Sequence, residues 1–470
     1  MVPMRIHRLL FLTCFTAFRS PVPAAAQQTA TRLDPTAALL ADLIRVNTSN
    51  PPGNEGLIAK LLEPRFKALG FETEIVPTPD SGKSHFIARL RGNGSKRPIL
   101  LAAHADVVGV EREKWTVDPF AGAVRDGHVI GRGAIDFKGG MAVFARAVMM
   151  LAERKVPLDR DIIFLAEADE EGGKYNTIWL AHDHWPALDC EFALNEGGWI
   201  IKGDDGRVKY VSISTADKSA VSLTVTATGT STHASMPRPD NAIFALSRAM
   251  ARLADYDPPV TLIPSTRLFF AALAKTSAPA LAARFRDLLS DDPRRVRAAD
   301  RVISRDPLLH AIMRTTIAPV LMNAGFRGNV IPGSAEATLN VRMIPGTDPN
   351  AIVADLQRVV ADPRVMVRLI PGGLRESQTS PDTTVLFTEL VRSAHMQFPG
   401  AEVTPYLFQA GTDAAAWRAK HIPVYGIYPY PITADELTRM HGNDETVSVE
   451  SLRQGTEMIF RTLVAVAGRQ

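Results

Sequence analysis

The stretch LLAAHAD, residues 100–106, decides how this chain is interpreted. An apolar run typical of a buried strand ends abruptly in His104, Ala105 and Asp106. The stretch GRGAID follows at residues 131–136, and DEEGG follows at residues 169–173. Imidazole and carboxylate groups at the ends of successive buried strands are what a hydrolytic metal site requires. The spacing therefore predicts such a site.

The first half of the chain alternates between strand and helix patterns. We expect strands at 71–76, 85–91, 98–103, 161–166 and 192–194, and helices at 37–46, 56–69 and 138–154. This alternation predicts a largely parallel sheet, in which ligands gather beyond the carboxyl ends of the strands. The acidic and imidazole residues at those ends are His104, Asp136, Glu170, Glu171 and Glu196.

The pattern changes near residue 217. We expect strands at 220–228, 335–343 and 365–370, helices at 241–253 and 349–360, and a helical segment without strands at about 265–323. After residue 376 the first domain resumes, with its last strand at 423–428 and a closing helix at 449–466. The predicted fold class is thus α/β: a mostly parallel-sheet catalytic domain (33–216 and 376–470) with an inserted α+β lid domain (217–375). Hinges are expected near residues 217 and 375.

Composition excludes some classes of protein and predicts export. The 470 residues are 46% hydrophobic and 22% charged, with a formal charge of +3. No concentrated basic face suggests nucleic-acid binding. Residues 1–26 combine basic Arg5 and Arg8, an apolar stretch and a small-residue cleavage site, which predicts a signal peptide and a periplasmic or secreted protein. No segment is long and apolar enough to predict a stable membrane span.

The candidate site residues have complementary chemistry. Zinc binds imidazole nitrogen and carboxylate oxygen, and a pair of ions requires a bridging ligand, which a carboxylate can be. A general base must stand beside the metal without being a ligand. The neighbours Glu170 and Glu171 can divide these two roles. Asp106 can hold the second ring nitrogen of His104.

These motifs occur together in one known family. The chain resembles the zinc metallopeptidase family of glutamate carboxypeptidase, carboxypeptidase S, acetylornithine deacetylase, succinyl-diaminopimelate desuccinylase and aminoacylase-1. The resemblance covers about residues 35–465 and rests on six motifs in order: HAD (104–106), GRGA (131–134) with Asp136 and Lys138, DEE (169–171), NEGG (195–198), GTSTH (229–233) and MHG (440–442). The phrase WTVDPF (115–120) and the helical insertion look most like the carboxypeptidase S branch.

The resemblance implies two zinc ions per subunit, with Co²⁺ or Mn²⁺ as alternatives. One ion would be bound by His104, Asp136 and Glu196, and the other by Asp136, Glu171 and His441. Asp136 would bridge the ions, and Glu170 would be the general base. Relatives often have a cis peptide bond after the bridging aspartate, where this chain has Phe137 instead of an acid or Asn.

The resemblance also assigns residues that would contact the substrate. His233 would polarise the scissile carbonyl, and Asn329, Arg342 and Gly411 would bind the substrate. A guanidinium can hold a carboxylate through two parallel hydrogen bonds, so Arg342 is the expected anchor for a free carboxylate.

The predicted function is hydrolysis of amide bonds by metal-activated water, with release of a C-terminal amino acid from short peptides. An N-acyl amino acid deacylase would use the same residues. A third reading is a solute-binding protein without chemistry, which predicts no bound metal and no effect of changing Glu170. In many relatives the second domain forms a homodimer; here the helical insertion could instead cover that surface.

Overall fold

The computed structural model describes residues 33–372 and 378–469. The expected signal peptide and the expected hinge at residue 375 lie outside these residues. The other expected hinge, Asp217, is the last residue of a strand. None of the described helices is both long enough and apolar enough to cross a membrane.

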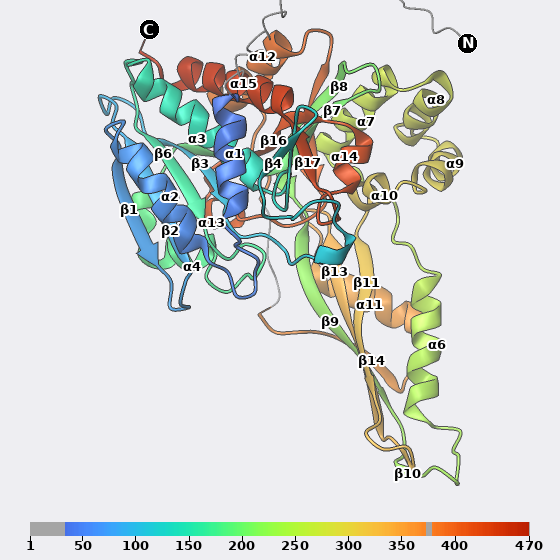
Figure 1. Cartoon of the computed structure of the whole chain (residues 1–470). Helices are drawn as coiled ribbons and strands as arrows, with labels where there is room; N and C mark the ends of the chain where they lie inside the picture. Colours follow the sequence, from blue (N-terminus) through green and yellow to red (C-terminus); the bar gives the residue numbers. More distant parts are fainter. Residues whose placement is uncertain (1–32, 373–377, 470) are drawn as a thin grey trace, which may run out of the picture. The chain divides into compact units, whose positions relative to one another are not determined.

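An eight-stranded sheet forms the centre of the fold (Figure 1). In spatial order its strands are β1 (Glu72–Pro77), β2 (Ser84–Leu90), β6 (Ile162–Glu167), β3 (Ile99–His104), β7 (Phe192–Lys202), β16 (Val424–Ile432), β8 (Val208–Asp217) and β15 (Glu402–Phe408). The four strands β6, β3, β7 and β16 run parallel to one another, as do β8 and β15. The remaining neighbours, including β1 with β2 and β2 with β6, are antiparallel. This confirms the predicted α/β fold with a mostly parallel sheet.

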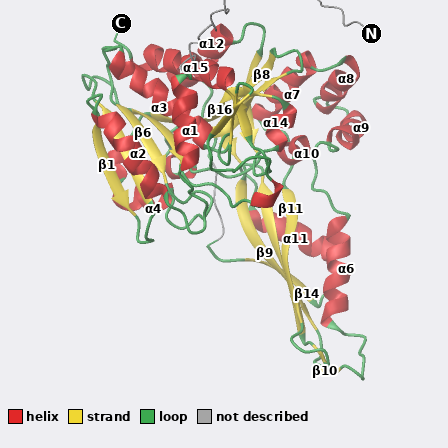
Figure 2. Cartoon of the chain, viewed as in Figure 1, coloured by secondary structure: helices red, strands yellow, loops and turns green. Residues whose placement is uncertain are grey.

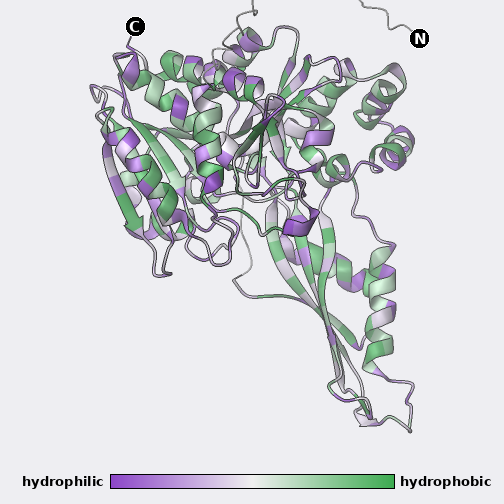
Figure 3. Ribbon diagram, viewed as in Figure 1, coloured by the Kyte–Doolittle hydropathy of each residue, from purple (hydrophilic) through white to green (hydrophobic). Residues whose placement is uncertain are grey.

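The central strands are apolar because helices cover both of their faces (Figure 3). Successive side chains of a strand point to opposite faces. Leu100 joins a buried cluster with helices α4 and α13, whereas Phe164 stacks on Phe66 of α2 at a ring distance of 5.1 Å. The helices associated with this sheet are α1 (Pro35–Arg45), α2 (Glu55–Lys67), α3 (Lys138–Glu153), α4 (Thr177–Asp183), α5 (Trp185–Leu188), α12 (Val385–Gln397), α13 (Ala415–Arg418), α14 (Ala434–Thr438) and α15 (Val449–Ala467).

A small three-stranded sheet joins distant parts of the chain. It consists of β4 (Ala123–Arg125), β5 (His128–Ile130) and β17 (Thr446–Ser448), and a 3₁₀ turn at Arg112–Lys114 precedes it. The expectation that 423–428 is the last strand was therefore wrong. With only three residues, β17 is too short to show an alternating pattern. Its pairing with β5 brings Glu445 beside the loop that carries Asp136.

The inserted region contains a four-stranded antiparallel sheet (Figure 2). Its strands are, in order, β11 (Thr316–Ala324), β13 (Ser334–Met343), β9 (Ser219–Thr228) and β14 (Val365–Leu369). Helices α6 (Ala242–Ala254) and α11 (Pro349–Val360) pack on one face, where they bury the alternating apolar residues of β9. Two short strands, β10 (Thr232–His233) and β12 (Val330–Ile331), pair with each other.

The segment expected to be helical without strands contains four helices and one strand. The helices are α7 (Pro264–Thr276), α8 (Pro279–Leu288), α9 (Pro293–Ile303) and α10 (Pro307–Met313), and each begins with proline, whose fixed φ suits the first helical position. The expectation was wrong from Thr316 onward, where β11 begins. This edge strand is largely exposed and contains Pro319, so it lacks the alternation that predicts a strand.

The helix α7 packs against the eight-stranded sheet. The ring of Phe269 contacts Tyr210 of β8 at 5.6 Å and Tyr406 of β15 at 4.9 Å. This part of the helical segment, which the sequence placed in the inserted domain, is thus attached to the central sheet and leaves β11 uncovered by α7.

Candidate metal centre

His104 is the last residue of β3, and its ring nitrogens have separate partners. Nδ1 lies 3.0 Å from the main-chain oxygen of Asp106, so it carries the proton and donates it there. Nε2 lies 3.1 Å from Asp136 Oδ1 and 3.6 Å from Glu196 Oε2. The Asp106 carboxylate is farther from Nδ1, at 3.7 Å. His104 is therefore oriented mainly by the main chain of Asp106, with Nε2 available as a ligand.

Asp136 lies between the two histidines. Its Oδ2 is 2.9 Å from Nε2 of His441, which is also 3.2 Å from Glu171 Oε1. Each carboxylate oxygen of Asp136 thus faces a different imidazole, which is the arrangement that a bridging ligand needs. The Asp136–Phe137 peptide bond is cis. The buried Phe137 ring packs 6.0 Å from the His104 ring and 5.1 Å from the Tyr428 ring.

Two groups of side chains have ligand atoms close enough to hold an ion. Within each group the atoms lie within 4.8 Å of one another, and the members are His104, Glu170 and Glu196 in one, and Asp136, Glu171 and His441 in the other. The second group is the one that the resemblance implies. The first contains Glu170 where Asp136 was expected, although Asp136 Oδ1 also reaches His104.

The chemistry of these donors suits a pair of divalent cations. Four carboxylates and two imidazoles, half of them buried, concentrate negative charge that dications would neutralise. Glu171 Oε1 is buried, and within the described part of the chain its contact with His441 Nε2, at 3.2 Å, lacks the geometry of a hydrogen bond. An acceptor oxygen in that position is costly unless a cation binds it. The residues therefore fit the pair of metal ions that the family resemblance implies.

The Asp106 carboxylate holds the loop that follows β6. It accepts hydrogen bonds from the main-chain N–H groups of Glu170 (3.2 Å) and Glu171 (3.0 Å). This contact places both acids of the pair at the edge of the sheet beside His104. Asp106 thus positions the loop as well as the histidine.

Burial and neighbouring charges shift the pKa values of the site. Burial, together with the Glu196 carboxylate, raises the pKa of Glu170 well above its usual value. Burial also raises the pKa of Glu196 to about 7. The neighbouring carboxylates of Asp136 and Glu171 raise the pKa of His441 to about 10. A carboxyl with a raised pKa can hold a proton during a reaction near neutral pH, which suits Glu170 as a base and acid.

Two residues of the centre were missed by the sequence analysis. The Tyr428 hydroxyl lies 3.0 Å from Asp136 Oδ1 and 2.9 Å from Glu196 Oε2. Glu445 accepts hydrogen bonds from the main-chain N–H groups of the Asp136 loop and pairs with Arg132 at 2.8 Å. Neither residue lies in a local pattern that signals a site, because each reaches the centre through long-range packing. Only the nearness of Glu445 to the MHG motif could have drawn attention to it.

The predicted substrate-binding residues fall into two pairs. Arg342 of β13 lies beside Gly411: its Nη1 is 3.5 Å from where a Cβ atom on Gly411 would be. His233 of β10 pairs with Val330, next to Asn329, and the main-chain oxygen of Asn329 accepts a hydrogen bond from Ala234. The exposed His233 ring contacts Ser235 and makes no hydrogen bond or ion pair with the described residues of the metal centre. The structure thus joins the members within each pair.

Comparisons with known proteins identify the family and the fold. The profile of peptidase family M20/M25/M40 matches residues 100–465. A probable carboxypeptidase S-like protein of Dictyostelium discoideum is 31% identical over 78% of this chain and 72% of its own length. The human N-fatty-acyl-amino acid synthase/hydrolase PM20D1 is 29% identical over 81% of this chain and 76% of its own. The crystal structure of an M20 family metallo-carboxypeptidase from Sulfolobus solfataricus has a similar fold, with a TM-score of 0.67 and 16% identity over 92% of this chain and all of that one.

Proposed function

Because this chain belongs to peptidase family M20/M25/M40, we propose that it binds two zinc ions and releases the C-terminal amino acid of short peptides. The chain is an enzyme that hydrolyses the amide bonds of peptides or N-acyl amino acids. A solute-binding protein without chemistry is thereby excluded.

The observation that carries the proposal is the position of Asp136 between two ligand groups. One of its oxygens lies 3.1 Å from His104 and the other 2.9 Å from His441. A carboxylate that faces two imidazoles in this way can bridge a pair of ions. A site for a single ion would not require such a bridging ligand.

The side chains divide the steps of the reaction. Bound zinc would make water acidic and polarise the scissile carbonyl. Glu170 would take a proton from the attacking water and return it to the leaving amine nitrogen. Arg342 would hold the free carboxylate of the substrate through its guanidinium. His233 would donate a hydrogen bond to the carbonyl oxygen, as the resemblance implies.

A second candidate is hydrolysis of N-acyl amino acids. The human relative PM20D1 favours it, because its name describes action on N-fatty-acyl-amino acids and it covers most of this chain. Both reactions use a free carboxylate beside the scissile amide, so Arg342 serves either. A panel of dipeptides and of short- and long-chain N-acyl amino acids would decide. Faster turnover of dipeptides supports the carboxypeptidase, whereas faster turnover of N-acyl substrates supports the deacylase.

Removal of metal tests the centre itself. Dialysis against a chelator should abolish activity, and adding back two equivalents of zinc should restore it, with Co²⁺ and Mn²⁺ as comparison ions. Elemental analysis of the purified protein would identify the native metal. Full activity after complete metal removal would contradict the proposal.

We also propose that the protein is exported to the periplasm or secreted. The support is the basic, apolar and small-residue pattern of residues 1–26. Cell fractionation with and without these residues would test it. Retention of the full-length protein in the cytoplasm would contradict it.

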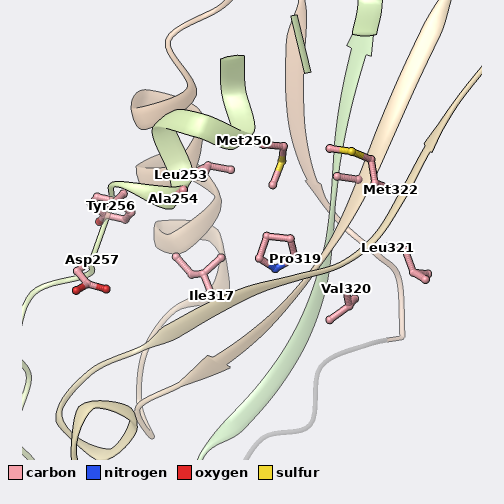
Figure 4. Close-up of a pocket in the computed structure, with 11 residues that line it drawn as sticks. Met250, Leu253, Ala254, Tyr256, Asp257, Ile317, Pro319, Val320, Leu321 and Met322 are labelled. Carbon is pink, nitrogen blue, oxygen red and sulfur yellow. The ribbon is translucent and has the colours of Figure 1, made fainter. Parts of the chain in front are cut away.

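The exposed edge strand β11 of the four-stranded sheet supports a homodimer. In the described part of the chain, β11 pairs with β13 alone, and Val320, Leu321 and Met322 on it are 54–61% exposed. Beside it, an apolar groove of about 550 Å³ lies between Met250 and Leu253 of α6 and Ile317 and Pro319 of β11 (Figure 4). An open strand edge with apolar side chains is a template for pairing with a second copy.

Light scattering of Leu321→Lys would test this dimer. We expect a dimeric wild type and a monomeric variant, while Leu268→Lys on the exposed side of α7 should stay dimeric. A monomeric wild type at micromolar concentration would contradict the proposal.

A further inference from the structure

Lys83 is a buried cation beside the loop that carries Glu170 and Glu171, and none of the six motifs includes it. The residue is only 7% exposed. Its ammonium group forms an ion pair with Asp169 Oδ1 and donates a hydrogen bond of 3.2 Å to Asn50 Oδ1. Burying an ammonium group is costly unless partners replace its water, so these contacts define where Lys83 lies.

Asn50 joins two carboxylates that would otherwise repel each other. Its Nδ2 donates a hydrogen bond of 2.8 Å to Asp106 Oδ2 and another of 2.8 Å to Asp169 Oδ1. Its Oδ1 accepts the hydrogen bond from Lys83, so both ends of the amide are used. The amide and the nearby cation thus let the carboxylates of Asp106 and Asp169 contact the same Asn50 side chain.

Asp106 and Asp169 hold different parts of the loop that follows β6 and carries Glu170 and Glu171. Asp106 accepts the main-chain N–H groups of Glu170 and Glu171. Asp169 Oδ2 accepts those of Lys174 and Tyr175, at 3.1 and 2.6 Å. Together the two carboxylates bind the loop at its start and after its Gly-Gly turn.

The backbone of Asp169 shows that this loop depends on its contacts. Its φ is 66°, in the left-handed region that non-glycine residues avoid. A residue keeps such a conformation only where surrounding contacts hold it. The contacts here are the side-chain bonds to Lys83 and Asn50 and a main-chain bond of 3.3 Å to Glu55.

We propose that Lys83 and Asn50 are positioning residues that fix Glu170 and Glu171 relative to His104 and Asp136. They act through Asp169 and Asp106, and neither is itself a metal ligand. The inference rests on the proposed function, because it takes Glu170 as the base and Glu171 as a zinc ligand.

The test compares Lys83→Met and Asn50→Ala with the wild-type holoenzyme. Loss of an outer contact to a metal site typically costs 10–100-fold in affinity or activity. We expect kcat to fall by about 10–100-fold while KM changes by less than about twofold, because substrate contacts are intact. Zinc titration should show about 10-fold weaker binding of one of the two ions, the one that Glu171 binds. Lys83→Arg keeps the charge and should recover most of both losses.

Lys60→Met is the matched control. Lys60 is exposed, lines the same surface groove as Lys83 and undergoes the same chemical change. It should keep wild-type kcat and zinc affinity. Thermal unfolding of each variant distinguishes a protein that misfolds from one that folds but no longer holds Glu170 and Glu171 in position.

The outcomes are distinct. Unchanged kcat and zinc affinity in Lys83→Met or in Asn50→Ala would overturn the proposal, as would a rise in KM alone. If Lys83→Met does not fold, Asn50→Ala decides by the same criteria; if neither folds, the network is structural and the proposal is wrong. A wild type that hydrolyses no substrate of the panel contradicts the proposed function instead, while the zinc titration still tests the positioning network.

Discussion

The metal centre and the inserted region hold their functional residues in different ways. In the centre, His104, Asp136 and Glu196 are buried and lie within 3.6 Å of a neighbouring ligand atom. In the inserted region, His233 lies on the two-stranded β10–β12 sheet, is exposed and, among the described residues, forms side-chain hydrogen bonds with Ser235 alone. Arg342 lies on β13 of the separate four-stranded sheet. The predicted metal ligands are thus preorganised by the central sheet, whereas the predicted substrate-binding residues lie on separate elements that would have to act together.

The strongest test of this contrast is Glu170→Gln. The amide cannot take a proton from water, so kcat should fall by about 10²–10⁴-fold. Steady-state kinetics would measure the loss, and elemental analysis should show an unchanged metal content. Activity within twofold of wild type would mean that the buried centre lacks the base assigned to it.

The buried carboxyl Glu55 should make the stability of this region depend on pH. Burial, with a contribution from the Asp106 charge, raises the pKa of Glu55 from 4.5 to about 7. The folded state holds this proton more tightly than the unfolded state does. The free energy of unfolding should therefore fall as the pH rises from about 4.5 to about 7, and stay level above that.

Glu55→Gln should remove this dependence, which amounts to at most about 3 kcal/mol. Urea unfolding at pH 5 and pH 8 would measure it. The control is Glu336→Gln, which should leave the pH dependence unchanged, because Glu336 is an exposed acid on β13 of the four-stranded sheet. Equal pH dependence in wild type and Glu55→Gln would contradict the prediction.

Arg342→Met tests the predicted substrate-binding residue on the four-stranded sheet. A hydrogen-bonded charge contact is worth about 1.5–3 kcal/mol, so kcat/KM for substrates with a free carboxylate should fall by about 10–100-fold. Substrates with an amidated C-terminus should be hydrolysed slowly by wild type and variant alike. If kcat/KM falls equally for substrates with a free carboxylate and for amidated substrates, Arg342 does not bind the carboxylate.

Tyr428→Phe should give the smallest effect. The hydroxyl contacts Asp136 and Glu196 without being a ligand of either predicted ion, so metal affinity should fall by about 10-fold. Competition with a chelator would measure it. Tyr406→Phe removes a buried hydroxyl that contacts Gln409, and it should behave as wild type.

The strand-end residues could be predicted because their signal is local. An apolar run followed by His104, or by Asp169, Glu170 and Glu171, marks a buried strand and the turn after it. Parallel neighbours place such turns at the same edge of the sheet, which is why β3 and β6 bring these side chains together. The sheet and most of its strands followed from this pattern, whereas the division of the residues into two ligand sets, with His441 in one of them, was implied by the family resemblance.

What could not be predicted depends on contacts between distant residues. Tyr428 and Glu445 approach Asp136 across 292 and 309 residues of chain. The strand β11 lacks alternation because most of its side chains are exposed. Lys83 and Asn50 are unremarkable in sequence and meet only where two loops pack against each other.

The sequence by itself thus determined the kinds of side chain at the centre and the edge of the sheet on which they lie, because strand ends and their turns are encoded by neighbouring residues. Only the tertiary structure decided that Asp136 faces both histidines, that Asp106 holds the loop of Glu170 and Glu171, and that Arg342 lies beside Gly411. These relations are set by the packing of segments far apart in the chain, and no local pattern records them.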